Sequence, residues 1–144
     1  MNKIIKLLFV SIMCLSCSTK NYLELNSIIN ERKAENSSEY ILIPTNGLAK
    51  SYSIIEKNIE YTIGISQEHK IIFISTTDKK FTIKGLRVND KLPESYFDKE
   101  LNFTPGWGYY VEIEESGWFA GFDFHTKPNH ELEIQWFFKF DFKN

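Results

Sequence analysis

The feature that most constrains the fold is an alternation of apolar and polar side chains near the end of the chain. Its even positions are all apolar: Leu132, Ile134, Trp136, Phe138, Phe140 and Phe142. The odd positions are mostly polar, and Phe137 is the exception. Because successive side chains of a β-strand point to opposite faces, a period of two predicts a strand over 132–142 with its even positions buried and its odd positions outward. A slip of one residue would reverse every side chain.

Shorter runs with the same period of two lead up to this strand. Turn signals such as Thr45-Asn46-Gly47 and Ser116-Gly117 separate them. Residues 51–54, 59–65, 81–84, 107–114 and 118–124 alternate, and residues 40–43 and 71–74 are continuous apolar runs; these spacings predict antiparallel hairpins.

Helical signals are few. Pro93 and Glu94 suit the first turn of a helix, and a helix over 92–101 would place four apolar side chains on one face: Leu92, Tyr96, Phe97 and Leu101. For residues 22–33, a helix and an extended tether both remain open. The predicted fold is thus a single α+β domain with an antiparallel sheet of about six or seven strands and one or two helices.

The start of the chain has the parts of a secretory signal. Lys3 and Lys6 form a short positive region, and the residues from Leu7 to Leu15 are apolar except for Ser11. A basic start, an apolar stretch of about 7–15 residues and a small residue at the cut define such a signal. The stretch is shorter than the roughly 20 apolar residues that cross a bilayer as a helix.

The end of this stretch, Cys14-Leu15-Ser16-Cys17, resembles the lipobox of bacterial lipoproteins. In that family a small residue precedes an invariant cysteine, which receives a diacylglycerol thioether before cleavage. The family usually has Leu three places before that cysteine, whereas this chain has Cys14. The resemblance implies lipid on Cys17, export, and anchorage in the bacterial cell membrane or outer membrane. It divides the chain into a signal peptide at 1–16, a lipidated N-terminus and tether at 17–39, and a β-rich domain at 40–144.

A second resemblance covers about a quarter of the chain. Residues 81–90 read Phe-Thr-Ile-Lys-Gly-Leu-Arg-Val-Asn-Asp, and a predicted helix and aromatic strands follow. This order is similar to small outer-membrane lipoproteins of the BamE/SmpA kind. The resemblance implies a scaffold or binding role.

Charge and cysteine content limit the possible functions. The full chain has 17 basic and 19 acidic residues. Without Lys3 and Lys6 the net charge is near −4, which argues against nucleic acid as a partner. Cleavage before Cys17 would remove Cys14, so the mature chain could form no internal disulfide and would have no free thiol for catalysis or metal binding. No cofactor or metal site is predicted.

Aromatic side chains near two glycine-containing turns form the candidate binding site: Trp107, Tyr110, Trp118 and Phe119. Such rings either belong to the core or form an exposed platform for a protein or glycan partner. Burial of Trp107, Tyr110 and Phe119 would exclude the platform. This non-enzymatic binding role is the favoured functional hypothesis.

The alternative hypothesis is a small envelope hydrolase. His125 lies near Asp123 and Glu131 in the sequence, and such groups could act as an acid/base pair. His130 and His69 complete the histidines. A carboxylate site at Glu112, Glu114 and Glu115 is also conceivable, although alternation makes Glu112 and Glu114 a solvated strand face. No nucleophile elbow or phosphate-binding glycine loop is present.

Overall fold

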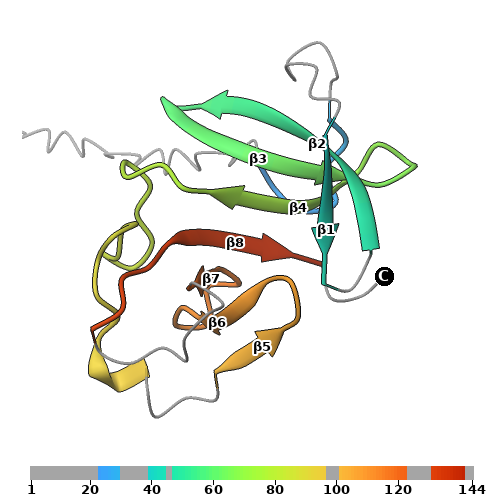
Figure 1. The fold of residues 1–144 in the computed structure, drawn as a ribbon. Helices are drawn as coiled ribbons and strands as arrows, with labels where there is room; N and C mark the ends of the chain where they lie inside the picture. Colours follow the sequence, from blue (N-terminus) through green and yellow to red (C-terminus); the bar gives the residue numbers. More distant parts are fainter. Residues whose placement is uncertain (1–22, 30–38, 45–46, 97–100, 123–130, 142–144) are drawn as a thin grey trace, which may run out of the picture.

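The computed structural model describes residues 23–29, 39–44, 47–96, 101–122 and 131–141. Eight strands form one antiparallel sheet in the order β1-β2-β3-β4-β8-β7-β6-β5 (Figure 1). The strands are β1 (Tyr40–Ile43), β2 (Gly47–Glu56), β3 (Ile59–Ile65), β4 (Ile71–Thr76), β5 (Asn102–Thr104), β6 (Gly108–Glu112), β7 (Phe119–Gly121) and β8 (Trp136–Phe140). The sheet curls into a half-barrel that leaves β1 and β5 as its two edge strands.

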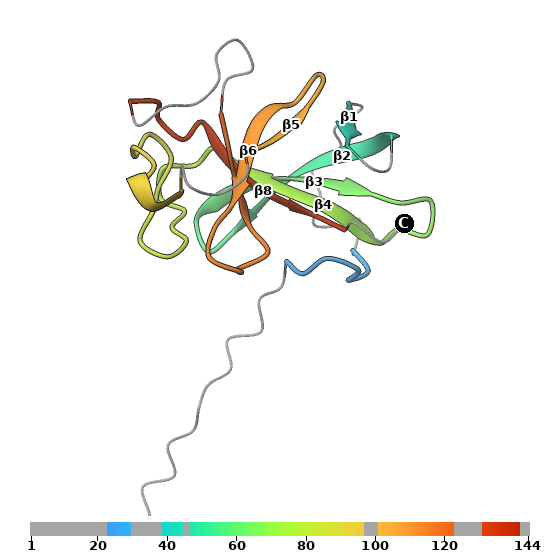
Figure 2. The ribbon, with the colours of Figure 1, turned by 90° about the horizontal axis from the view of Figure 1, so that it is seen from below.

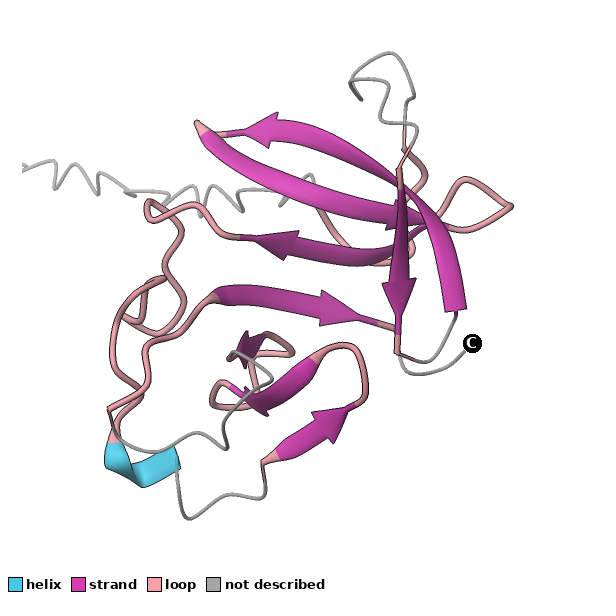
Figure 3. Ribbon diagram, in the orientation of Figure 1, coloured by secondary structure: helices cyan, strands magenta, loops and turns pink. Residues whose placement is uncertain are grey.

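The predicted α+β class is wrong, because the described residues contain no α-helix (Figure 3). Within the predicted helix 92–101 there is only a 3₁₀ turn, η2 (Glu94–Tyr96), and residues 97–100 lie outside the described part. The backbone just before this segment is hydrogen-bonded to the segment before β8. Asn89 N donates to Ile134 O at 2.8 Å, and Ile134 N donates to Asp90 O at 2.9 Å. Apolar spacing suited a helix, but the partners of these peptide groups are non-local.

The number of strands also differs from the six or seven predicted. Residues 81–84 do not join the sheet, because Ile83 and Leu86 bridge each other across a tight turn at Lys84 and Gly85. Residues 102–104, where the predicted helix should have ended, instead form β5.

Residues 23–29, which we call the strap, contain a turn at Leu25 and Asn26 and are hydrogen-bonded to the start of β4. Asn26 N donates to Ile71 O at 2.7 Å, and Ile71 N donates to Ser27 O at 2.9 Å. The described part of the segment 22–33 is therefore not helical. It packs on the sheet through Leu23, Leu25 and Ile29.

Both faces of the sheet are covered. One face carries the aromatic cluster, whose buried members are Ile43, Ala49, Ile72, Phe73, Trp107, Tyr110, Phe119, Phe138 and Phe140. The irregular segment 81–96 covers part of the other face, where Phe81, Val88, Leu92 and Tyr96 are buried. The strap covers the remainder with Leu23, Leu25 and Ile29. Irregular chain thus supplies the cover that a helix was predicted to supply.

The predicted face assignment of the last strand is only partly correct. Ile134, Phe138 and Phe140 are buried as predicted, and Gln135 is exposed. Phe137 is fully buried, however, because it lies 5.4 Å from the Phe81 ring of the covering segment. Trp136 and Lys139 are both half-buried. A strand that is covered on two faces does not follow a simple alternation.

Candidate binding cleft

The aromatic platform predicted from the sequence does not exist. Trp107 is 8% exposed, Tyr110 is 8% exposed and Phe119 is 6% exposed, and all three belong to the aromatic cluster. Trp118 is half-buried, with its ring 4.7 Å from that of Phe81. The curl of the sheet points these side chains into the core. Their position near glycine-containing turns therefore does not expose them to solvent.

Trp107 instead joins the two edges of the sheet. It lies in the turn between β5 and β6, and its Nε1–H donates to the carbonyl oxygen of Leu42 in β1 at 2.7 Å. Its ring lies 4.9 Å from Phe138 and 5.3 Å from Phe73, both in edge-to-face geometry. An indole that buries its ring and satisfies its N–H is a core residue.

The acid/base candidates are not assembled in the described residues. Asp123, His125 and His130 lie outside the described part of the chain, as does Cys17, and Glu131 is exposed. The hydrolase hypothesis stays untested. Among the described residues, no group of three or more His, Cys, Asp and Glu side chains could hold a metal ion.

The three glutamates after β6 have structural surroundings. Glu112 accepts a hydrogen bond from Gly117 N at 3.2 Å, across the β6–β7 turn. Glu114 lies 3.8 Å from Lys84 Nζ, and both Glu114 and Glu115 have positive φ angles in that turn. Glu114 therefore belongs to a turn. The alternation had predicted that it shares a strand face with Glu112, and this prediction is wrong.

A cleft of about 910 Å³ opens between the β1–β2 hairpin and the β3–β4 loop. The strap reaches its edge through Asn26. The lining residues are Asn26, Tyr40, Leu48, Ala49, Lys50, Tyr52, Ile65, Ser66, Gln67, Glu68, His69, Lys70 and Ile72. We call this feature the cleft.

The first wall of the cleft is the exposed end of the β1–β2 hairpin. Tyr40 is 68% exposed and Leu48 is 72% exposed. Leu42 pairs directly with Leu48 and is also exposed, at 46%. Lys50 Nζ lies 5.0 Å from the centre of the Tyr52 ring, a distance suited to a cation–π contact. This wall combines apolar side chains with one lysine.

The backbone of β1 also faces outward at alternate residues. Ser51 N donates to Glu39 O at 2.9 Å, so Glu39 and Ser51 form a hydrogen-bonded pair. In an antiparallel pair such positions alternate with pairs whose peptide groups point away. The peptide groups of Tyr40 and Leu42 therefore face away from β2. The hydrogen bond from Trp107 to Leu42 O is consistent with this orientation.

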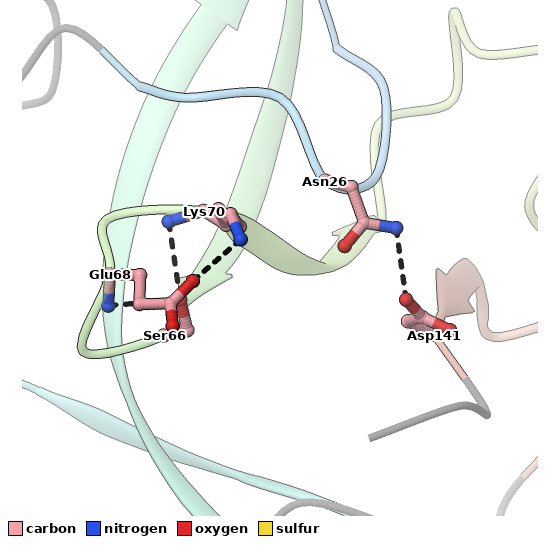
Figure 4. Close-up of polar contacts among 5 residues, drawn as sticks. All are labelled: Asn26, Ser66, Glu68, Lys70 and Asp141. Carbon is pink, nitrogen blue, oxygen red and sulfur yellow. Dashed lines mark hydrogen bonds and ion pairs between the residues drawn. The ribbon is translucent and has the colours of Figure 1, made fainter.

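The second wall is the four-residue loop Ser66–His69, where the sequence predicted it. Ser66 Oγ accepts hydrogen bonds from Glu68 N and Lys70 N, each at 3.2 Å (Figure 4). His69 takes a positive φ of 59° and donates its N–H to Ser66 O at 3.0 Å. Serine side chains favour such turns because they hydrogen-bond to nearby backbone.

Charges in this loop are paired. Lys70 Nζ lies 2.5 Å from Glu68 Oε2 (Figure 4). This hydrogen bond, together with the attraction of the ammonium, lowers the pKa of the Glu68 carboxyl. Both side chains are well exposed, so the pair shapes the rim of the cleft and contributes little to stability.

The sequence shows the three apolar residues of the β1–β2 hairpin but does not show that they are exposed. Tyr40 and Leu42 precede Pro44 and were placed in a predicted strand, whereas Leu48 follows the turn and was left unassigned. Their exposure follows from the position of β1 at the edge of the sheet, which depends on the order of strands and not on local pattern.

Comparison with protein-family models, with curated proteins and with solved structures finds no match to this chain. Within the described part of the chain, none of the helical structure is long and apolar enough to span a membrane. The arguments for function therefore rest on the residues alone.

Proposed function

We propose that the chain is a lipoprotein, anchored through Cys17, whose β domain binds a protein partner at the cleft without catalysing a reaction. The signal-like start and Ser16-Cys17 support the anchor. The observation that carries the binding role is the exposure of Tyr40, Leu42 and Leu48 on an edge hairpin beside the cleft. Large exposed apolar side chains that gather in one place are typical of interaction sites.

The chemistry of the cleft favours an extended polypeptide segment over a glycan. An extended segment can add as a further strand to outward peptide groups of an edge strand; in β1 these are the Tyr40 peptide groups and the Leu42 N–H, since Leu42 O accepts from Trp107. Leu42 and Leu48 offer aliphatic surface for side chains of that segment, and Tyr40 is the one large exposed aromatic residue among the described lining residues. A sugar-binding platform would need more exposed ring surface.

Crosslinking at two matched positions of β2 tests this proposal. Leu48 lines the cleft, whereas Ile55 does not, and their exposed fractions are 72% and 71%. A photo-crosslinking amino acid placed at position 48 in the native host should trap a discrete partner band. The same amino acid at position 55 should trap none, and adding Tyr40→Ala should reduce the yield at position 48 by about tenfold, as loss of an aromatic anchor does.

The outcome that contradicts the binding role is equally plain. If positions 48 and 55 give the same products, the cleft is not the binding surface. Both positions are exposed, so neither substitution removes core contacts. Circular dichroism of the purified variants, compared with the unsubstituted protein, checks that they fold.

A further inference from the structure

We propose that the strap side of the domain lies against a phospholipid surface, and that β5 lies on the side facing away from it. The proposal rests on the lipid anchor at Cys17 proposed above. It is based on the position of the strap, which begins at Leu23 and contacts the sheet. The strap runs along one side of the sheet, and β5 projects from the other (Figure 2).

The strap is fixed to the domain by hydrogen bonds at several points. Besides its bonds with Ile71, it donates from Ile29 N to His69 O at 3.2 Å. Asn26 Nδ2 donates to the carboxylate of Asp141 at 2.9 Å, so the strap is also bound to the residue that follows β8 (Figure 4). It occupies the position beside β4 that β8 leaves when it ends.

Apolar contacts add to these bonds. Leu23, Leu25 and Ile29 pack on a cluster of buried residues on the covered face of the sheet, made of Tyr52, Ile63, Ile65, Ile71 and Ile74. Glu24, Asn26 and Ile28, at the alternate positions, are exposed. Inward and outward side chains thus alternate along the strap, although Asn26 lies in a turn with a φ of 66°, and the inward side chains pack on the core.

The length of chain between the lipid and the strap is short. Six residue steps separate Cys17 from Leu23. Whatever their conformation, they reach at most about 22 Å, since an extended chain spans 3.3–3.6 Å per residue. A tether that continued to residue 39 would reach about 75 Å by the same measure. The shorter reach holds the strap side near the bilayer and prevents the domain from turning over.

The outward side of the strap suits the headgroup region. Ile28 is 76% exposed and bridges Lys70, whose ammonium is at the rim of the cleft. An exposed apolar side chain fits the boundary between headgroups and acyl chains, where it can insert, while the Lys70 ammonium is paired with the Glu68 carboxylate. Asn26 of the strap is one of the residues that line the cleft.

Site-directed fluorescence quenching tests this orientation. The lipidated protein should have no free thiol, so Gln67→Cys and Phe103→Cys each give one labelling site. Both residues are exposed; Gln67 lies in the loop that the strap contacts, and Phe103 lies on β5. With nitroxide on the headgroups of phosphatidylglycerol–phosphatidylethanolamine vesicles, the dye at position 67 should be quenched about threefold more than at position 103, because the tether fixes the nearer side.

Two results would overturn the inference and are distinguishable. Equal quenching at positions 67 and 103 in membrane-bound protein would show that the domain turns freely, and would leave the anchor intact. Thiol labelling of the unsubstituted mature protein, or its failure to sediment with vesicles, would remove the anchor and this inference with it. A Leu25→Ser, Ile29→Ser variant, which loosens the strap, should abolish the difference between the two positions.

Discussion

Replacing Trp107 with Ala should lower the free energy of unfolding by about 3–5 kcal/mol, as removal of a large buried aromatic side chain does. The indole is 8% exposed and contacts Phe73 and Phe138 of the aromatic cluster. It also donates its N–H to Leu42 O in the opposite edge strand. Its loss would both open a cavity and release β1 from the β5–β6 turn.

A second variant separates these two contributions. Trp107→Phe keeps most of the ring contacts but removes the N–H donor, so it should cost about 1 kcal/mol from the hydrogen bond and somewhat more from the smaller ring. Urea unfolding followed by far-ultraviolet circular dichroism measures both variants without relying on tryptophan emission. If Trp107→Ala cost less than about 1 kcal/mol, well below the usual cavity penalty, the closure of the sheet by this residue would be refuted.

Replacing Phe137 with Ala should destabilise the protein as much as replacing Phe138 with Ala, about 3–5 kcal/mol in each case. The two rings lie on opposite faces of β8, and both are fully buried. Phe138 lies among the rings of Trp107, Tyr110 and Phe119, while Phe137 packs on Phe81. Equal losses would demonstrate that both faces of the strand are covered.

The matched control for this pair is Gln135→Ala. Gln135 precedes β8, has the same parity as Phe137 and is exposed, so its replacement should change stability by no more than about 0.5 kcal/mol. The alternation in the sequence placed Phe137 on that outward side. A small loss of stability for Phe137→Ala together with a large loss for Phe138→Ala would indicate that only one face of β8 is covered. That result would contradict the packing of residues 81–96 on the other face.

Local pattern predicted several strands closely. A short apolar run placed a strand at 40–43 and period-two alternation placed one at 59–65, which are the bounds of β1 and β3. The apolar run at 71–74 lies within β4, and the Ser66–His69 loop joins β3 to β4 as predicted. These elements follow from side-chain alternation and turn chemistry, which neighbouring residues determine.

The failures have a common physical cause. The helix at 92–101 was inferred from apolar spacing, but Asn89 and Asp90 bond to Ile134, far away in the sequence. The aromatic platform was inferred from density of rings near turns, but the curl of the sheet turns Trp107 inward. Which peptide groups pair, and which faces are covered, are decided by distant segments, so no local window of sequence contains that information.

The candidate site was the least predictable part. The residues that line the cleft come from the strap, from β1 and β2, and from the β3–β4 loop. Tyr40 and Leu48 have ordinary strand character in the sequence, and only the position of β1 at an edge makes them exposed. The sequence left both a helix and a tether possible for the strap, because Leu25, Ile28 and Ile29 suit a helical face. Its backbone instead hydrogen-bonds to Ile71, which lies far away in the sequence.

Membrane attachment through Cys17 is the central claim, and incorporation of a clickable palmitate analogue in the native host tests it most directly. The unsubstituted protein and Cys14→Ser, the matched control, should both carry the fatty acid, because only Cys17 would receive it. Cys17→Ser should carry none. An unlabelled native protein, or a Cys17→Ser variant that remains labelled, would contradict the lipoprotein assignment.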